Sequence, residues 1–371
     1  MPKRKTHIDR PLLILLAILL VGGGFIFASA AFGYLARSGN NVSSVVFSHL
    51  VLGLGFGISA LIAACNVDYH IWRRWAPHIF TAALLLTVAV FIPHIGASHG
   101  GGRRWIYLAQ FSLQPSEILK IAAIVMAAAY FSTIKAKINE WKYGLAGVTG
   151  ILALPVIILI LQPDIGTLGI ICIAVISIFW MAGGRMRDLL LVGIIALLLL
   201  GGLVMMKGYV RDRITTFLNP SVGAQAEGYQ IRQSLIAIGS GGWTGRGWGQ
   251  GIQKFSYLPE PMGDSIFAVA GEELGFIGTV SIVALFLGFA LRGFSIAARA
   301  PDMFGTLLAA GISTYLVIEA FINIASMLGV APLTGIPLTF ISQGGTAMLV
   351  SLASAGILLN VSRHQKRRSA A

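Results

Sequence analysis

The chain has 371 residues, of which 56% are hydrophobic and 11% are charged, and its mean hydropathy is +0.82. Soluble globular domains contain about 45–50% apolar residues, so this composition excludes an ordinary soluble domain. The formal net charge of +13 does not indicate nucleic-acid binding, because the basic residues form short clusters at the ends of apolar segments, where they orient membrane proteins. We therefore predict an integral membrane protein that binds no nucleic acid.

Ten apolar segments are each long enough to cross a hydrocarbon core of about 30 Å. In chain order they are residues 11–36, 45–65, 76–95, 115–134, 144–161, 165–182, 188–206, 265–291, 303–328 and 333–361. Each must be helical, because lipid offers no hydrogen-bond partners to the backbone and the segments lack the alternation of a barrel strand. We predict an all-α protein whose ten transmembrane helices form a single domain over residues 1–371.

The basic residues between these segments predict the orientation of the chain. If the N-terminus is cytoplasmic, then the basic start (residues 1–10), the basic tail (362–371) and most other clusters face the cytoplasm. The short outer loops then hold only Arg37, Arg103 and Arg104. This is the distribution of the positive-inside rule, and it predicts that both termini are cytoplasmic.

Two long connections are extracytoplasmic in this topology: residues 96–114, and the large loop 207–262 between the seventh and eighth helices. Long ordered loops tend to carry function. The basic start followed by Ala28-Ser29-Ala30 also resembles a cleavable signal peptide. The intervening apolar stretch is longer than a usual signal-peptide core, which favours an uncleaved anchor.

The first long connection carries two arginines on the side where the positive-inside rule disfavours them. It reads GGGRRWIYLAQFSLQPSEILK over residues 100–120, with Arg103 and Arg104 next to Trp105. Guanidinium groups bind phosphate through charge-assisted hydrogen bonds, so both arginines are candidates to hold a phosphate or pyrophosphate. The alternatives are anchoring of the arginines to lipid headgroups and a place for Trp105 in an interfacial aromatic belt.

A helix is predicted to begin at Pro115, a residue favoured in the first turn, and to carry Glu117 and Lys120 on one face. An ionisable pair just inside a span is costly unless it faces a polar cavity, which favours a binding role over a purely local i,i+3 ion pair. In the next outer hairpin, Asp164 precedes the helix that begins at Ile165. We predict that Asp164 caps this helix, with a direct functional role as the alternative.

The large outer loop ends in QKFSYLPEPMGDS, residues 253–265, which leads straight into the eighth span. A glycine-rich run from Gly241 to Gly251 precedes it, but its spacing is not that of a dinucleotide-binding fingerprint and no strand precedes it. We place the candidate site in the polar loop and helix start around Asp264. For Asp264 itself, an N-cap of the eighth helix is the structural alternative.

Four stretches of the chain closely resemble motifs of one family and stand in the family's order. They are GRRWIYLAQFSLQPSEILKIA, QPDIGT, QKFSYLPEPMGDSIFAVAGEELGFIG and TGIPLTFISQGG. On these motifs the chain is identified as a member of the SEDS family (shape, elongation, division and sporulation), and the similarity spans nearly all ten predicted helices. Three further stretches resemble FtsW more than RodA: GYQIRQSLIAIGSGGWTGRGWGQGIQK, IEAFINIASMLGVAPLTGIPL and GILLNVSRH.

The resemblance implies a peptidoglycan glycosyltransferase that polymerises lipid II at the outer face of the bacterial plasma membrane, with an FtsW-like role in septal wall synthesis during cell division. It implies a class B penicillin-binding protein transpeptidase and other divisome or elongasome membrane proteins as partners, beside the membrane lipids. Asp264 matches the family's essential aspartate and is the candidate general base. The candidates for binding substrate or pyrophosphate are Arg103, Arg104, Trp105, Glu117, Lys120, Asp164, Lys254 and Ser342.

The chain departs from the family pattern beside this aspartate. Met262-Gly263 replaces a common His-Thr, and Ser265 replaces a common Phe. Gln343 stands where a tyrosine usually follows the motif serine, and Glu319 stands where a glutamine is common in the division branch. The fold is expected to be unaffected, whereas substrate contacts beside Asp264 are expected to differ.

Other functions are compatible with the same residues. A RodA-like elongation polymerase is the alternative within the class. From other classes, a transporter that flips lipid II would also use intramembrane Glu and Lys residues, and a scaffold would only recruit partners. The polar groups concentrate at the outer ends of the spans, which favours a one-sided enzyme site.

No cofactor is assigned from the sequence, and the metal site is unknown. A divalent cation, Mg²⁺ or Mn²⁺, that bridges Asp264 and the pyrophosphate is chemically reasonable, because such cations take oxygen ligands. His94 and His99 do not form a convincing metal site.

Overall fold

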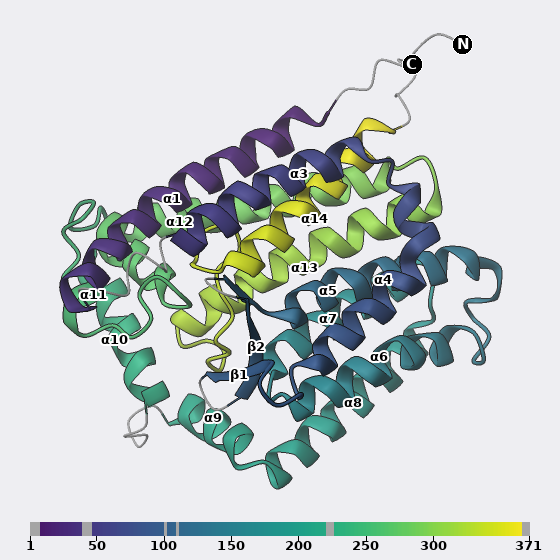
Figure 1. Cartoon of the computed structure of the whole chain (residues 1–371), viewed down its shortest axis with the longest axis horizontal. Coiled ribbons are helices and arrows are strands. Elements are labelled where there is room, and N and C mark those ends of the chain that lie inside the picture. Colours follow the sequence, from purple (N-terminus) through teal and green to yellow (C-terminus); the bar gives the residue numbers. More distant parts are fainter. Residues whose placement is uncertain (1–7, 39–46, 100–101, 109–110, 220–225, 366–371) are drawn as a thin grey trace.

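The computed structural model describes residues 8–38, 47–99, 102–108, 111–219 and 226–365, and its long helices lie side by side in one bundle (Figure 1). The long helices are α1 (Arg10–Ser38), α3 (Phe56–Asn66) preceded by the π-helix η1 (Ser48–Gly55), α4 (His70–Ala89), α5 (Pro115–Thr133), α6 (Gly144–Leu161), α7 (Ile165–Met181), α8 (Met186–Met206), α12 (Ile266–Ala298), α13 (Met303–Met327) and α14 (Gly345–Arg363). Each of them overlaps one of the predicted segments.

Within the described residues, eight helical stretches are long and apolar enough to cross a membrane. The chain is therefore a multi-pass α-helical membrane protein. Two of the ten predicted spans fall outside this group: α7 has only 17 residues, and α4 begins with the polar sequence HIWRRWAPH. The count of ten spans and their orientation remain predictions, and most of the predicted basic termini lie outside the described residues.

The predicted start of the last span was wrong, because residues 333–344 are not helical and α14 begins only at Gly345. Gly335 and Phe340 adopt positive φ angles of 68° and 65°, which a helix does not allow. Side chains satisfy the backbone of this segment instead: Asn323 donates to the Ile336 carbonyl at 2.7 Å. The segment thus enters the bundle as irregular chain among polar side chains, an arrangement tolerated at membrane depth only inside protein.

The all-α class is confirmed by the helical bundle, and the first long connection, predicted only as a loop, contains a small antiparallel sheet. Its strands are β1 (Gly96–His99), β2 (Gly102–Leu108) and β3 (Phe111–Leu113), in the order β1-β2-β3. Successive side chains of a strand point to opposite faces. In β2, Ile106 is accordingly buried while Arg103 and Tyr107 are exposed. Arg103 is exposed and Arg104 is half-buried, and the register of β2 against β1 is irregular between Arg103 and Trp105.

The large loop is mostly helical. It contains α9 (Gly208–Leu218), α10 (Ala226–Ser240) and the short α11 (Gln253–Ser256). Helix α10 covers the beginning of the family-like stretch that starts at Gly228. Figure 1 shows α10 and α11 beside the end of α1, at one end of the bundle.

Helix α12 is interrupted at Gly275, whose φ of 65° and ψ of −163° are not helical. The glycine-rich segment of the large loop fills the interruption. Arg246 and Gly247 donate backbone hydrogen bonds to the carbonyls of Glu272 and Glu273 at 3.0 and 3.1 Å, and Phe276 donates to the Gly242 carbonyl at 2.9 Å. The loop therefore replaces the helical hydrogen bonds that the break removes.

Gly275→Ala is expected to destabilise the protein by at least about 1–3 kcal/mol, because this backbone region is almost restricted to glycine. An added Cβ would also collide with the backbone nitrogen of Gly245. The measurement is thermal unfolding of the detergent-purified variant. Gly288→Ala is the control in the same helix, because the nearest atoms to its Cβ would lie at 3.5 Å; equal loss of stability in both variants would contradict the prediction.

Candidate functional site

Asp264 lies where the large loop meets α12. Its Oδ1 accepts a hydrogen bond from Gln230 Nε2 of α10 at 2.9 Å, and its backbone carbonyl accepts one from Asn323 Nδ2 of α13 at 2.8 Å. Ser265, not Asp264, occupies the N-cap position of α12. The structure therefore does not support the alternative in which Asp264 is simply the helix cap. The side chain of Asp264 is bound by α10 and its backbone by α13.

The irregular segment 333–344 supports the loop before Asp264. Ser342 Oγ donates to the Gly263 carbonyl at 2.6 Å and accepts from the Leu338 amide at 2.8 Å. The Gln343 amide donates to the Met262 carbonyl at 2.7 Å. In this structure, Ser342, predicted to bind substrate, positions the chain next to Asp264.

The environment of Asp264 raises the pKa of its carboxyl group to about 7. Burial is the main cause, and the negative charge of nearby Glu260 adds to it; the hydrogen bond from Gln230 and backbone amides act in the opposite direction. Both effects follow from the cost of placing a negative charge in a poorly solvated site beside another negative charge. A carboxylate that titrates near neutral pH has the property expected of a general base.

A second polar cluster is formed by Glu117 and Lys120 of α5 with Glu319 of α13. Lys120 Nζ lies 2.9 Å from Glu117 Oε2 and 2.8 Å from Glu319 Oε1, and each of these side chains is at most 3% exposed. The predicted Glu117–Lys120 pair is confirmed, and Glu319 is its third member. Asn323, which holds Asp264, follows Glu319 by one turn of α13, about 6 Å along the axis.

This cluster is incompletely satisfied. Glu117 Oε2 and Glu319 Oε2 are buried without a hydrogen-bond partner among the described residues, although Glu117 Oε2 is within ion-pair distance of Lys120. Buried polar atoms are normally paired with protein or water. The formal charges of the cluster sum to −1, so Glu319 Oε2, which has no partner among the described residues, suits water or a substrate hydroxyl better than a phosphate oxygen.

Arg104 points from β2 to the turn between α6 and α7. Its guanidinium donates to the carbonyls of Gln162, at 3.2 Å, and Pro163, and Nη1 lies 4.0 Å from Asp164 Oδ1. Asp164 accepts from the Thr167 amide at 3.4 Å, which confirms it as the N-cap of α7. Arg104 therefore ties the sheet to α7.

The other two residues of the predicted arginine motif are more accessible. Arg103 is exposed on β2, and Trp105 is half-buried. Arg104, by contrast, is half-buried against the turn before α7. Of the two arginines, Arg103 is thus the better placed to meet a large ligand from outside.

Lys254, another residue predicted to bind pyrophosphate, is completely buried in α11. Its Nζ donates to Glu273 Oε1 at 2.5 Å, to Ser29 Oγ at 2.6 Å and to the Gly249 carbonyl at 3.1 Å. These three acceptors use all three N–H groups of the ammonium. In this structure Lys254 therefore joins α1, α12 and the large loop, and its role in binding substrate stays a prediction.

Three residues of the site were missed by sequence reasoning. Gln230 and Asn323 hold Asp264, and Ser116 donates to Asp164 Oδ2 at 3.1 Å. Asn323 carried a usable signal, since an amide in an apolar span is costly without a partner. Gln230 and Ser116 carried none, because each lies in a polar helix start where such residues are common.

The described residues do not form a built metal site. No group of three or more His, Cys, Asp or Glu residues in this part of the chain is placed to hold a metal ion. A cation at Asp264 would have to take most of its oxygen ligands from substrate and water.

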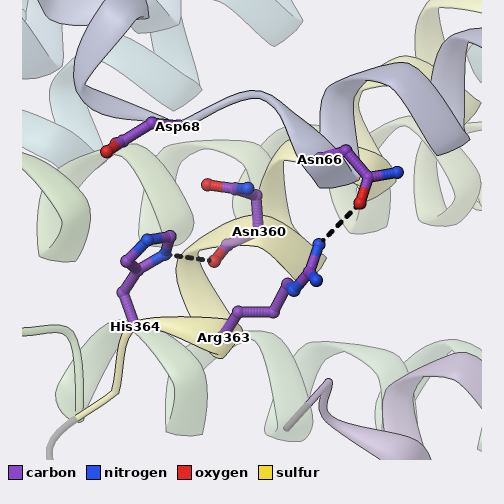
Figure 2. A pocket seen from close by; sticks show the side chains of 5 residues that line it. All are labelled: Asn66, Asp68, Asn360, Arg363 and His364. Atoms are coloured by element: carbon purple, nitrogen blue, oxygen red, sulfur yellow. Dashed lines mark hydrogen bonds between the residues drawn. The ribbon is translucent and has the colours of Figure 1, made fainter. Parts of the chain in front are cut away.

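A polar pocket of about 220 Å³ lies at the far end of α14, between Asn66, Asp68, Asn360, Arg363 and His364 (Figure 2). Asn360 accepts from the Tyr69 amide at 3.0 Å and donates to the Cys65 carbonyl at 2.7 Å, so these side chains fasten α14 to the α3–α4 connection. The 19 residues of α14 span about 28 Å. The pocket is thus remote from the segment beside Asp264.

Comparisons with known proteins agree with this architecture. The family model described as cell cycle protein, for FtsW, RodA and SpoVE, matches residues 10–367. The chain is 38% identical to stage V sporulation protein E of Bacillus subtilis, over 99% of this chain and 100% of that protein. It is 43% identical to a Geobacter sulfurreducens protein named "Probable peptidoglycan glycosyltransferase FtsW", over 84% and 83% of the two chains.

A solved structure shares the fold. A chain from a study of how a peptidoglycan synthase complex coordinates polymerization and crosslinking superposes with a TM-score of 0.80 and 25% identity. The match covers 96% of this chain and 98% of that one. The helical bundle is therefore shared over nearly the whole length of both chains.

Proposed function

Because the chain belongs to the SEDS family of FtsW, RodA and SpoVE, we propose that it is a peptidoglycan glycosyltransferase that polymerises lipid II. The observation that carries this proposal is Asp264: a partly buried carboxylate in a family motif, held by Gln230 and Asn323, with its pKa raised to about 7. The similarity to FtsW supports a role in septal wall synthesis; a RodA-like elongation role is the alternative.

In the proposed reaction Asp264 accepts the proton of the GlcNAc 4-hydroxyl of the acceptor. The oxygen then attacks the anomeric carbon of the lipid-linked donor, a new C–O bond forms with inversion, and the bond to the pyrophosphate breaks. The pyrophosphate leaves on its lipid carrier with the bonding electrons. A positioned base supplies about 10²–10⁴ in rate for such a proton transfer.

The developing charge on the pyrophosphate requires cations. Arg103 and Arg104 are proposed to supply them, since arginine binds phosphate through directed hydrogen bonds, and Trp105 flanks them. Lys120 is enclosed by Glu117 and Glu319, so it reaches a phosphate only by leaving Glu319. A divalent cation that arrives with the pyrophosphate would add to this charge stabilisation.

The proposed setting follows from the charge pattern of the sequence. Ten spans in the bacterial plasma membrane, with both termini cytoplasmic, place Asp264, β2 and the large loop 207–262 outside, where lipid-linked disaccharide is joined to glycan. The solved relative comes from a peptidoglycan synthase complex, which supports a class B penicillin-binding protein as partner. Other divisome or elongasome membrane proteins complete the proposed set.

The direct test supplies purified protein in detergent with lipid II, with and without a class B penicillin-binding protein. Appearance of glycan strands, resolved by gel electrophoresis, supports the polymerase. Movement of lipid II across vesicle membranes without new glycosidic bonds would instead identify a flippase. Absence of both activities in the complex would leave a scaffold and overturn the proposal.

The pH dependence of polymerisation gives a second test. The base works only when ionised, so the rate is expected to rise with pH through a midpoint near 7, the raised pKa of Asp264. In Glu260→Gln the neighbouring negative charge is gone, the pKa of Asp264 falls, and the midpoint moves to lower pH. The control is Glu140→Gln, which changes an exposed glutamate before α6 and should leave the pH–rate profile unchanged. If the midpoint of the Glu260→Gln profile equals that of the wild type, Asp264 is not the base.

A further inference from the structure

An apolar pocket of about 270 Å³ lies between α1 and η1, outside the site described above. From α1 it is lined by Gly24, Phe27 and Phe32 with small alanines, and from η1 by His49, Leu50 and Leu54. The pocket is large enough for a sizeable hydrocarbon group, since an apolar cavity of about 150 Å³ already accepts benzene. Phe32 and Leu50 are 53% and 51% exposed, so the pocket opens on the outer surface of the bundle, which faces lipid.

His49 is the one polar side chain among the described residues that line this pocket. It is 2% exposed, its ring stacks on Phe27 with centroids 3.9 Å apart, and its Nδ1 has no hydrogen-bond partner among the described residues. An unpaired buried donor or acceptor costs about 1–3 kcal/mol. His49 lines the pocket, and the χ2 torsion of a histidine ring is soft, so the ring can adjust its orientation to a ligand. A ligand that offers a hydrogen-bonding group there would remove this cost.

The position of His49 indicates which group that is. His49 is the first residue of its apolar span, His49–Asn66, so it lies where the hydrocarbon core meets the interfacial region of the bilayer. Among the residues that the structure describes, no Lys or Arg lines the pocket, and an unpaired phosphate charge there would be very costly. A neutral hydrogen-bond acceptor at the headgroup end of a hydrocarbon chain fits both the interfacial position of His49 and the apolar lining. The ester carbonyl of a glycerolipid is such a group.

The shape of α1 and η1 leaves the space open. A Cβ on Gly24 would meet no atom within 4 Å. The π-helical winding of η1 is rare in proteins and occurs frequently at functional sites. We propose that this pocket binds one acyl chain of a membrane glycerolipid, with the ester carbonyl accepting a hydrogen bond from His49 Nδ1–H.

Native mass spectrometry of the full-length purified protein tests the proposal through lipid retention, a readout independent of polymerase activity. The probes are a dioleoyl phosphatidylglycerol, its diether analogue without ester carbonyls, and undecaprenyl phosphate. The wild type is expected to retain the diester about fivefold more than the diether, the factor that one ordinary hydrogen bond supplies. His49→Phe keeps the ring stack on Phe27 and is expected to retain both lipids equally.

A pair of glycine variants on α1 tests the pocket itself. Gly24→Leu fills the pocket and is expected to lower retention of both glycerolipids, whereas Gly22→Leu, whose Cβ also meets no atom within 4 Å but which does not line the pocket, retains them. Thermal unfolding checks that the variants fold; if Gly24→Leu does not, His49→Phe decides. Equal retention of diester and diether by the wild type, preferential retention of undecaprenyl phosphate, or equal behaviour of the two glycine variants would each overturn the proposal.

Discussion

Asp264→Asn is expected to lower the rate of lipid II polymerisation by a factor of about 10²–10⁴, the usual contribution of a general base. Asparagine has the shape of aspartate, and its Oδ1 still accepts the hydrogen bond that Gln230 donates in the wild type. Its backbone carbonyl still accepts from Asn323. The substitution therefore removes the base while it keeps the contacts of the loop, and glycan strands formed per unit time are the measurement.

Loss of activity in this variant is expected without loss of stability. The pKa of Asp264 in the folded protein, about 7, lies above its ordinary value of 3.8, so folding disfavours the ionised carboxylate. This penalty is absent below about pH 3.8, grows as the pH rises, and is complete above about pH 7. At pH 8, Asp264→Asn should therefore unfold at the same temperature as the wild type or at a higher one.

Asp302→Asn is the matched control for this experiment. Asp302 caps α13 by accepting from the Gly305 amide at 3.3 Å, and asparagine caps helices about as well as aspartate. Polymerisation by Asp302→Asn should stay within about twofold of the wild type. An Asp264→Asn variant that still forms glycan strands at the wild-type rate would remove Asp264 from the mechanism.

Hydropathy located the helices well because lipid leaves the backbone no alternative to helix. It failed at residues 333–344, where the apolar composition is that of a span. There the positive φ angles of Gly335 and Phe340 are incompatible with a helix, and Asn323 and Ser342 supply hydrogen bonds to the backbone. A window average of hydropathy does not register such side chain–backbone bonds.

The candidate site was only partly predictable, because hydrogen bonds and ion pairs between distant segments are not visible in the sequence. The motifs identified Asp264, Lys120 and Arg104, but the partners that give them their properties come from distant parts of the chain. Lys254 shows the consequence: its motif position indicated substrate binding, whereas its three buried acceptors lie on other elements. Likewise, only the folded structure distinguishes the exposed Arg103 from Arg104, which donates to the turn before α7.

Lys120→Met is expected to lower the free energy of unfolding by about 3–5 kcal/mol, the cost of leaving buried charges without their partner. In the wild type Lys120 is enclosed by Glu117 and Glu319 at 2.9 and 2.8 Å. Methionine fills much of the same volume but leaves two glutamates side by side in a buried position. Chemical or thermal unfolding in detergent measures the change.

Glu319→Gln is the informative comparison, because it removes a negative charge from the cluster whereas Lys120→Met removes the positive one. Glutamine still accepts from Lys120, and the remaining Lys120–Glu117 pair has no net formal charge, so stability should change by less than about 1 kcal/mol. The double variant Lys120→Met with Glu319→Gln should be more stable than Lys120→Met alone, since only one glutamate then remains unpaired.

If Glu319→Gln lowers the free energy of unfolding as much as Lys120→Met does, the cluster depends on both carboxylates and Lys120 is fixed there. If it is tolerated and the KM for lipid II falls, Lys120 released from Glu319 contacts the pyrophosphate.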